Sequence, residues 1–377
     1  MAPFSFWEQS SFLAPADTVI IGAGIVGLTA ALRRRALQPT ARIVVFDRAP
    51  FGEGGSTRNA GFACFGSPTE LLADLKTMPE SALIDLVQKR FEGLKYLREL
   101  LNDTQLDYRN TGSYELFTQR EAKGAEEALR ELDRLNRMLF PITGAQTFGE
   151  ADVQTMQTQH GFSGFNTAIY NPHEGSIDTG KMMFNLRQRA VQANIEIYSG
   201  IEVLEVSPCA GGCELAIDNV RMRCNTVLVC TNGFAKQLLP HLDVLPARNR
   251  VIITKPIPDL TWEGTFHMIE GYVYFRNVGQ RILIGGGRHL DPEWSSIDAP
   301  LPTAIDDYLT DLLSRHLLSD RKVEIEQKWI GYLGIGSQKT PYLQRIAPNL
   351  FCAVRMGGMG VAIGARIGKE LAEMADT

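Results

Sequence analysis

Three glycines near the start of the chain have the spacing of a turn that binds phosphate. Gly22, Gly24 and Gly27 form the pattern G-x-G-x-x-G. The first glycine would make the bend, the second would let the backbone approach a pyrophosphate, and the third would let a helix pack closely on the preceding strand. The amide groups and the dipole at the start of that helix, around Ile25 and Val26, would then face the phosphate charge. The pattern therefore predicts a dinucleotide site.

An acidic residue follows at a distance that suits such a site. Asp47 lies 25 positions after Gly22 and directly before Arg48. A carboxylate at this point can accept hydrogen bonds from both hydroxyl groups of a ribose, and it would repel a 2′-phosphate. The glycine turn and the acid together predict dinucleotide binding, and they leave FAD and NAD both open.

The elements that must position these residues form a βαβ unit. Residues 18–22 are a short apolar run typical of a strand buried on both faces, a helix is expected over 25–35, and a second parallel strand over 43–46. Apolar spacing predicts further helices at 81–101, 120–140, 179–193, 303–318 and 361–374. Strands are expected at 195–199, 202–206, 213–217, 226–230, 323–330 and 350–354, and residues 248–287 predict an antiparallel sheet.

The composition is that of a globular protein with two domains. The chain has 377 residues, of which 44% are hydrophobic and 21% charged, and single cores rarely grow far beyond about 250 residues. The net charge of −5 gives no attraction to nucleic acid or to an anionic membrane. No apolar run reaches the roughly 18 residues of a membrane helix, and no basic segment precedes the first apolar run. We therefore expect no nucleic-acid partner, no membrane span and no secretory signal.

The cysteines carry no metal signature. None of the six is part of a C-x-x-C pattern or of a metal-ligand spacing with histidine, so we expect no metal site and a reduced, cytoplasmic compartment. Small buried thiols on strands explain most of them. Cys64 alone is expected in a loop near the cofactor.

Three further segments resemble parts of a known flavoenzyme family. Residues 54–62 (GGSTRNAGF) follow the acid, residues 226–233 (TVLVCTNG) form an apolar strand that ends in glycine, and residues 355–361 (RMGGMGV) precede the final helix. In their order and spacing, together with the valine at position 203, they resemble the D-amino-acid oxidase superfamily, especially its glycine and sarcosine oxidase branch. The resemblance covers nearly the whole chain.

The resemblance implies FAD as the cofactor. Beyond the first turn and its acid, the residues it places against FAD are Gly55, Ser56, Thr57, Asn59, Ala60, Gly61, Val203, Thr231, Gly233, Gly357, Gly358, Met359, Gly360 and Val361. The final helix would point its N-terminus at the flavin N1–C2=O edge, where negative charge gathers on reduction, a need that an NAD enzyme does not have. Residues 329–333 lack the cysteine that tethers the flavin in sarcosine oxidases, so FAD is expected to bind noncovalently.

The resemblance also implies the fold class. We expect an α/β fold in which a Rossmann-like FAD-binding domain is interleaved with an α+β substrate domain built on an antiparallel sheet. The FAD-binding domain would comprise residues 14–75, 160–245 and 335–377, and the substrate domain residues 76–159 and 246–334.

In this family the substrate lies between the flavin and the antiparallel sheet. Side chains alternate along a strand, so Tyr272, Tyr274 and Arg276 share one face and are the candidate substrate wall; an outward, solvated face is the alternative. Enzymes of this kind move a hydride from the carbon that bears nitrogen to flavin N5, which gives an imine that water hydrolyses. The cofactor carries that chemistry and the protein supplies alignment, so no histidine is nominated as catalytic.

The usual anchors for a substrate carboxylate are missing. The positions where relatives carry a lysine or an arginine are Ala362 and Gly358 here, whereas Arg355 stands where the family has glycine. Arg355, or an arginine at position 58, 276 or 288, could instead supply a guanidinium. Leu283 replaces a lysine thought to activate oxygen, so the electron acceptor could be O2, a quinone or a protein.

The function predicted from these residues is FAD-dependent oxidation of a small amine or amino acid. Two alternatives stay open at this point: an FAD-dependent dehydrogenase of a 2-hydroxy acid or polyol phosphate, and a flavoprotein that binds or assembles with a partner without turnover. An NAD-dependent dehydrogenase is a third alternative. The net negative charge of the chain argues against an enzyme that modifies tRNA.

Overall fold

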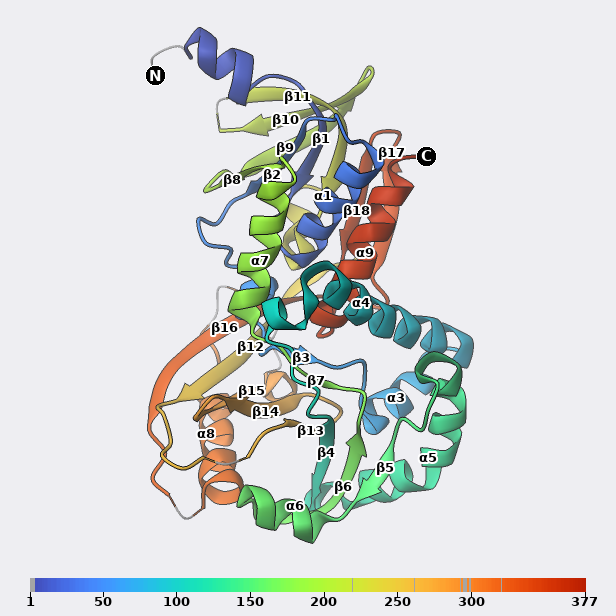
Figure 1. The fold of residues 1–377 in the computed structure, drawn as a ribbon, viewed down its shortest axis with the longest axis vertical. Helices are drawn as coiled ribbons and strands as arrows, with labels where there is room; N and C mark the ends of the chain where they lie inside the picture. The colour runs from blue at the N-terminus through green and yellow to red at the C-terminus, as the bar shows by residue number, and fades with distance from the viewer. Residues whose placement is uncertain are drawn as a thin grey trace.

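The computed structural model describes residues 4–218, 220–260, 262–291, 293, 297, 300–319 and 321–377. Within these residues, two large sheets lie one beyond the other along the long axis of the molecule, with helices packed against them (Figure 1). A small sheet joins β3 (Phe62–Ala63) to β7 (Gly175–Ser176) between them. The expected mixed α/β class is confirmed.

The first sheet contains the predicted βαβ unit. Its main path runs β17-β18-β11-β1-β2-β8, and β9 and β10 extend it through β11. The bounds are β1 (Ala16–Ile21), β2 (Ile43–Asp47), β8 (Glu196–Ser199), β9 (Val203–Cys209), β10 (Gly212–Ile217), β11 (Val220–Val229), β17 (Tyr342–Ala347) and β18 (Leu350–Val354). The strands from β8 to β18 along this path pair in parallel. Ile20 packs into one core cluster while Val19 and Ile21 pack into another, so β1 is buried on both faces.

The second sheet has the order β16-β12-β15-β14-β13-β4-β6-β5. The bounds are β4 (Ser113–Thr118), β5 (Gly149–Ala151), β6 (Phe165–Asn171), β12 (Leu245–Thr254), β13 (Thr265–Met268), β14 (Val273–Val278), β15 (Arg281–Gly286) and β16 (Ile325–Ile335). Its neighbours pair antiparallel except β13 and β4, which are parallel. This pair joins strands that lie about 150 residues apart in the chain.

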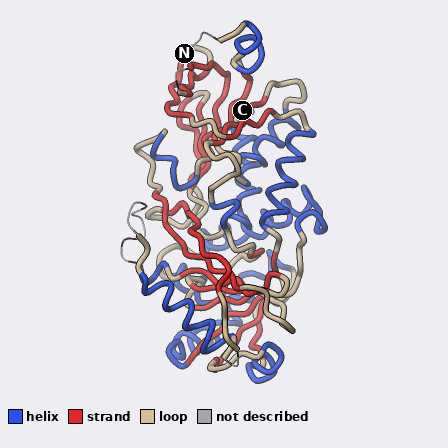
Figure 2. The backbone as a smooth tube through the Cα atoms, turned by 90° about the vertical axis from the view of Figure 1, so that its left-hand side faces the viewer, coloured by secondary structure: helices blue, strands red, loops and turns tan. Residues whose placement is uncertain are grey.

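The described helices are α1 (Ile25–Leu37), α2 (Gly55–Arg58), α3 (Pro68–Leu75), α4 (Glu80–Leu106), α5 (Ala122–Thr143), α6 (Val153–His160), α7 (Thr179–Gln192), α8 (Thr303–Leu312) and α9 (Gly360–Met374). Helices α1, α4, α7 and α9 share one core cluster with the first sheet, and Figure 2 shows several helices gathered along one side of it. Helix α4 approaches α9 closely because Gly93 has no side chain: a Cβ there would lie 2.1 Å from the carbonyl oxygen of Ala362. This contact fixes the start of α9.

Some elements differ from the sequence-based expectations. The helix expected over 303–318 ends at Leu312 and continues as one wider turn, Leu313–Leu317. Strands β4, β6 and β17 were not expected. Strand β4 pairs with β6 and with β13, both far away in sequence, whereas β17 pairs with the next strand, β18. Strand β6 belongs to the second sheet, so the chain returns to the first sheet only after residue 171 rather than at residue 160. The exact domain boundaries stay predictions.

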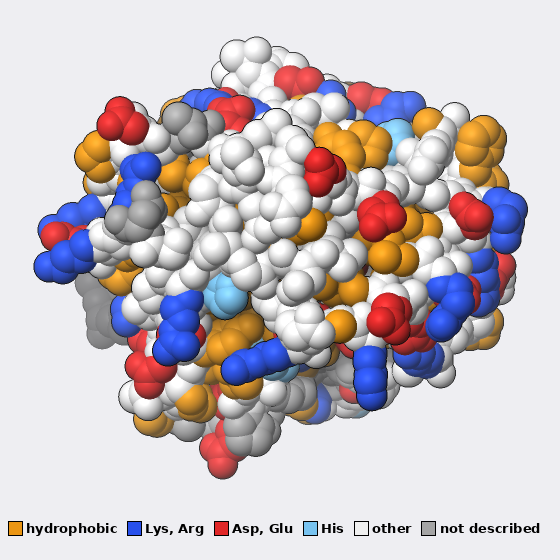
Figure 3. All heavy atoms as spheres, turned by 90° about the horizontal axis from the view of Figure 1, so that it is seen from below, with side chains coloured by type: hydrophobic (Ala, Val, Ile, Leu, Met, Phe, Trp, Pro, Cys, Tyr) orange, Lys and Arg blue, Asp and Glu red, His pale blue; other side chains and the backbone are white. Residues whose placement is uncertain are grey.

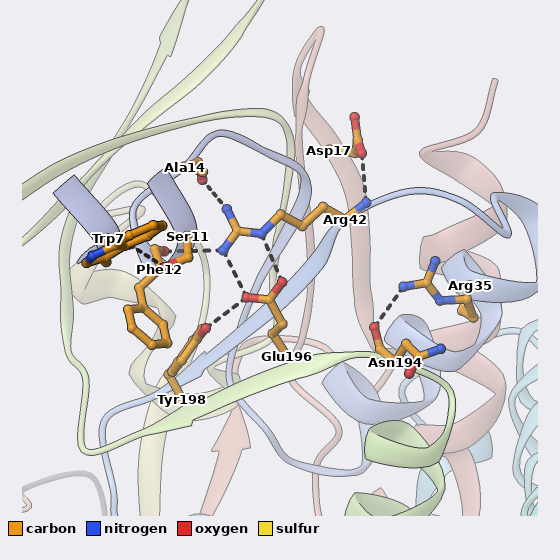
Figure 4. Close-up of polar contacts among 10 residues, drawn as sticks. All are labelled: Trp7, Ser11, Phe12, Ala14, Asp17, Arg35, Arg42, Asn194, Glu196 and Tyr198. Atoms are coloured by element: carbon orange, nitrogen blue, oxygen red, sulfur yellow. Dashed lines mark hydrogen bonds and ion pairs between the residues drawn. The ribbon is translucent and has the colours of Figure 1, made fainter. Parts of the chain in front are cut away.

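The N-terminal segment is tied to the edge of the first sheet by one arginine. The Arg42 guanidinium donates two hydrogen bonds to the Glu196 carboxylate at 2.9 Å, and it also donates to the carbonyl oxygens of Phe12 and Ala14 (Figure 4). Arg42 thereby lowers the pKa of Glu196, which stays ionised.

Charged side chains of both signs lie on the surface (Figure 3), as the similar numbers of basic and acidic residues in the sequence suggest. On the face seen from below, basic and acidic side chains are interspersed with apolar ones (Figure 3). None of the described helices is both long and apolar enough to cross a membrane.

Candidate functional site: two adjoining cavities

A cavity of about 710 Å³ lies where the carboxyl ends of β1, β2 and β11 meet the starts of α1 and α9. The edge at the carboxyl ends of parallel strands is where α/β sheets bind ligands. Most of the predicted cofactor residues line it: Gly22, Gly24, Ile25, Val26, Asp47, Arg48, Gly55, Ser56, Thr57, Asn59, Val203, Thr231, Gly233, Gly357, Gly358, Gly360 and Val361. The fold thus brings together segments from both ends of the chain.

The glycine turn has the geometry that its sequence predicts. Gly22 has a φ of +108°, and a Cβ there would lie 2.7 Å from the carbonyl oxygen of Cys230. Gly27 lines neither cavity, and a Cβ there would lie 1.9 Å from the carbonyl oxygen of Gly22. Gly27 therefore serves helix packing, whereas Gly24 begins α1 without a side-chain cap.

Asp47 holds the backbone around this turn as well as facing the cavity. Its Oδ2 accepts a hydrogen bond from the amide of Ala23 at 2.8 Å, and its Oδ1 accepts one from the amide of Ala49 at 2.9 Å. Each carboxylate oxygen can accept more than one hydrogen bond, so capacity remains for ribose hydroxyls.

The glycine-rich segment forms a short helix, α2, against the start of α1. Ser56 Oγ accepts a hydrogen bond from the amide of Ile25 at 3.0 Å. The Asn59 side chain donates to the carbonyl oxygens of Gly55 and Ser56, and its Oδ1 accepts from the amide of Gly61 at 2.8 Å. Gly61 lines neither cavity and turns the chain at a φ of +73°. The segment predicted to lie beneath FAD is therefore rigidly held.

The start of α9 opens onto the cavity without a side-chain cap. The turn before it is fixed by Gly357, which has a φ of +59° and whose amide donates to the carbonyl oxygen of Gly334 in β16. An uncapped helix start carries partial positive charge. The position suits a ligand group that becomes negative.

In the turn Asn232–Gln237 the sequence predicted only Gly233 as a cofactor contact, and it missed the rest of the wall that this turn forms. Phe234 and Gln237 line the cavity, and the Arg48 guanidinium lies 4.3 Å from the centre of the Phe234 ring. Thr231 precedes this turn, and its buried Oγ1 has no hydrogen-bond partner among the described residues. A buried hydroxyl of this kind requires a partner.

A second cavity, of about 420 Å³, adjoins the first on the side of the second sheet. The two share Gly55, Arg58, Asn59, Tyr332, Leu333, Met356, Gly357, Gly358 and Val361. Ala60 and Met359, both predicted to contact FAD, line only this second cavity. A molecule in it would lie directly beside one in the first.

Of the three residues predicted to form the substrate wall, the structure places two at the second cavity and one away from it. Tyr272 and Tyr274 line the second cavity, and the Tyr274 hydroxyl accepts a hydrogen bond from the Asn249 side chain at 2.9 Å. Burial raises the pKa of Tyr274, so it is a neutral phenol. Arg276 does not line the cavity: its guanidinium donates to the carbonyl oxygens of Ala60 and Ile177.

Arg355 lines the second cavity, but other parts of the chain hold its guanidinium. Its Nη1 lies 2.7 Å from Asp243 Oδ2, and its Nε donates to the carbonyl oxygen of Thr340 at 3.0 Å. Its φ of +65° is the conformation that favours the glycine found at this position in the family. The other cationic side chains of the lining are Arg58, Arg90, Arg288 and Lys339.

A buried cluster that the sequence did not reveal lies against this cavity. Cys64, Glu174 and His267 come from three separate segments, and their ligand-type atoms lie within 4.8 Å of one another. Burial raises the pKa of Glu174 to about 7 and lowers that of His267 to about 4. It also raises the pKa of Cys64, which stays a thiol. No sequence spacing could have found it, because the sheet pairing assembles it.

Comparison with known proteins agrees with this geometry. The model of the family described as FAD dependent oxidoreductase (DAO) matches residues 17–374. The chain belongs to this family. It is therefore an FAD-dependent oxidoreductase, as the glycine turn and the C-terminal segment predicted.

Relatives of this FAD-dependent oxidoreductase cover almost its whole length. It is 24% identical to the probable oxidoreductase OrdL of Rhizobium meliloti over 96% of this chain and 83% of that protein. Among solved structures, glycine oxidase from Geobacillus kaustophilus has a TM-score of 0.76 at 19% identity, covering 97% of this chain and 96% of that one. Iminodiacetate oxidase from Chelativorans sp. BNC1 has a TM-score of 0.76 at 20% identity, covering 94% of each chain. These structures show the same fold.

The first cavity fits the cofactor that the family requires. Two helix starts whose N-cap residues provide no side-chain cap face it, the turn at Gly22 and Gly24 leaves backbone exposed to a pyrophosphate, and the buried Thr231 hydroxyl has no hydrogen-bond partner within the described part of the chain. The residues that would hold FAD there are those of the glycine turn, Asp47 and the start of α9.

Proposed function

We propose that the protein oxidises the C–N bond of a small amine or amino acid whose reacting carbon lies in the second cavity. The observation that carries the proposal is that the two cavities share lining residues, and that Tyr272 and Tyr274 line the second one. FAD, when bound, supplies the acceptor for a hydride at N5. The substrate nitrogen first loses its ammonium proton to water, and the iminium ion that remains after hydride loss hydrolyses in water. The chain's own residues bind and align the substrate and exclude water.

The electrostatic character of the second cavity favours an anionic substrate group. Among the described residues, five cationic side chains line it (Arg58, Arg90, Arg288, Lys339 and Arg355), against two acidic ones, Glu70 and Glu270. Arg90 pairs with Glu70, and Lys339 pairs with the buried Asp74. Arg288 lies over the Tyr272 ring, 4.9 Å from its centre, within the predicted substrate wall. We propose Arg288 as the anchor for a substrate carboxylate.

We further propose that FAD is held without a covalent bond. The cysteines that line the two cavities are Cys64 and Cys230, and burial raises the pKa of both. Attachment of a flavin to cysteine requires the thiolate, and these residues stay thiols. Precipitation with acid should therefore release all of the flavin into the supernatant.

Anaerobic reduction of the bound flavin tests the substrate class. Glycine, iminodiacetate and L-proline are mixed with the holoenzyme, alongside glycolate, lactate and glycerol 3-phosphate, and the loss of flavin absorbance is recorded. We expect reduction by at least one amine. Reduction by a hydroxy compound and by no amine would assign the site to the alternative dehydrogenase chemistry.

The same preparation distinguishes the possible electron acceptors. The flavin is reduced anaerobically and then mixed either with air-saturated buffer or with a water-soluble quinone. Fast reoxidation by O2 would identify an oxidase, whereas reoxidation by the quinone alone would identify a dehydrogenase. A flavin that no small molecule reduces, together with a stable protein partner in pull-downs, would instead favour a binding role.

A further inference from the structure

The cluster at the second cavity contains an imidazole with an unsatisfied nitrogen. His267 lies on β13 and is 9% exposed, and its Nε2 has no hydrogen-bond partner among the described residues. This atom lies 4.0 Å from Glu174 Oε2. The residue also lines the cavity, so the ring stands between a buried carboxylate and the space for a substrate.

Glu174 is held in place from the opposite side. Its Oε1 accepts hydrogen bonds from the amides of Phe65 at 2.7 Å and Gly66 at 3.2 Å, and its Oε2 accepts one from the Ser113 hydroxyl. These donors favour the ionised form, whereas complete burial favours the neutral form. A cation placed nearby would shift the balance toward the carboxylate.

We propose that His267, backed by Glu174, is the subsite that receives the amine nitrogen of the substrate and makes the cavity prefer a cationic amine to an alcohol. The inference rests on the proposed amine oxidation and names the residues that bind the amine nitrogen. The neutral imidazole accepts an N–H from the ammonium group. The carboxylate behind it attracts the positive charge in surroundings of low dielectric constant.

The proposal predicts that the affinity for an amine depends on pH, and this can be measured without any catalytic turnover. The ionisable groups around the pair are Cys64, Glu70, Arg90, Tyr108, Glu115 and Tyr274. Among them Glu115 also has a pKa of about 7, but its carboxylate is turned to Ser67 and Thr69 and does not line the cavity. Binding of a cation beside Glu174 should therefore expel the proton of Glu174 near neutral pH.

The experiment uses two ligands that cannot be oxidised. 2-Aminoisobutyrate and 2-hydroxyisobutyrate share one skeleton, and neither has a hydrogen on the carbon that would donate hydride. Their binding to the oxidised holoenzyme is followed by the change in flavin absorbance and by calorimetry in buffers of different ionisation enthalpy. We expect the amine to bind roughly tenfold more tightly at pH 8 than at pH 6 with proton release, because Glu174 loses its proton over this range. The hydroxy acid should show no such change.

Two variants test the residues. Glu174→Gln should abolish the pH dependence, and His267→Phe should weaken amine binding by about tenfold or more at pH 8, with the affinity for the hydroxy acid unchanged in both. The matched control is His160→Phe. His160 is half-buried, and burial lowers its pKa to about 4 as well, but it packs among aromatic rings and lines neither cavity.

The outcomes separate this inference from the proposed function. A wild-type enzyme that does not bind the amine more tightly than the hydroxy acid, or variants that bind it unchanged, would overturn the inference even if amines reduce the flavin. Stoichiometric Zn²⁺ binding that is lost in His267→Phe would assign the cluster to a metal ion and would also overturn it. Selective amine binding that depends on His267, without flavin reduction by any amine, would support the subsite and contradict the proposed oxidation.

Discussion

Arg276 Nε donates a hydrogen bond of 2.6 Å to the carbonyl oxygen of Ala60, and this bond joins the second sheet to the loop predicted to contact the flavin. A second bond of 2.9 Å, from Nη2, reaches the carbonyl oxygen of Ile177. Burial lowers the pKa of Arg276 to about 10, so the guanidinium stays charged at neutral pH. The arginine expected to face the substrate instead clamps the backbone between the two sheets.

Replacing Arg276 should therefore affect stability and FAD retention. Arg276→Met leaves two buried carbonyl oxygens without donors, which should lower the free energy of unfolding by about 2–4 kcal/mol. Denaturant unfolding and the flavin content after gel filtration measure the effect. The control is Arg281→Met on β15, where a partly exposed side chain pairs with Glu326 and little change is expected. Equal stability of the two variants would show that the clamp is not needed.

The glycines of the first turn should separate cofactor binding from folding. Gly24 lines the first cavity, and a Cβ there would lie 2.7 Å from Ser56 Oγ, so Gly24→Val should fold and lose most of its FAD. A Cβ at Gly27 would meet the carbonyl oxygen of Gly22 at 1.9 Å, so Gly27→Ala should destabilise the whole domain. Circular dichroism and flavin absorbance of each purified variant give the two readouts. Normal FAD content in Gly24→Val would contradict the placement of the pyrophosphate.

Arg288→Ala should weaken the binding of a carboxylate substrate. A charge-assisted hydrogen bond contributes about 1.5–3 kcal/mol, so KM should rise roughly tenfold or more with a smaller change in kcat. Arg281→Ala at the start of β15 is the control, because Arg281 lines neither cavity. An unchanged KM for the acid would place the anchor elsewhere in the cavity.

Glu115 should make stability depend on pH. Burial raises its pKa from 4.5 to about 7, so the folded protein binds a proton more tightly than the unfolded chain does. This contribution is complete below pH 4.5 and is lost as the pH rises toward 7, by an amount on the order of 3 kcal/mol. Glu115→Gln cannot ionise, so its stability relative to wild type should increase between pH 5 and pH 8 in urea unfolding. A constant difference would mean that Glu115 titrates alike in both states.

The sequence by itself determined the cofactor end of the molecule. The glycine turn, Asp47 and the C-terminal Gly357–Gly360 segment are short, and each is dictated by local backbone geometry: a bend, a close approach or an uncapped helix start. Such local requirements produce a residue pattern that can be recognised in the sequence before the fold is known. For the same reason the strands and helices with strong apolar spacing, such as β1 and α1, agree with the sequence to within a few residues.

Only the tertiary structure decided the substrate end. Alternation along a strand predicted that Tyr274 and Arg276 share a face, but it could not show which of them meets a cavity and which meets the carbonyl oxygens of another segment. Likewise Cys64, Glu174 and His267 are brought together by the pairing of β3 with β7 and of β13 with β4. Contacts between segments a hundred or more residues apart depend on how whole sheets pack, and no local pattern records them.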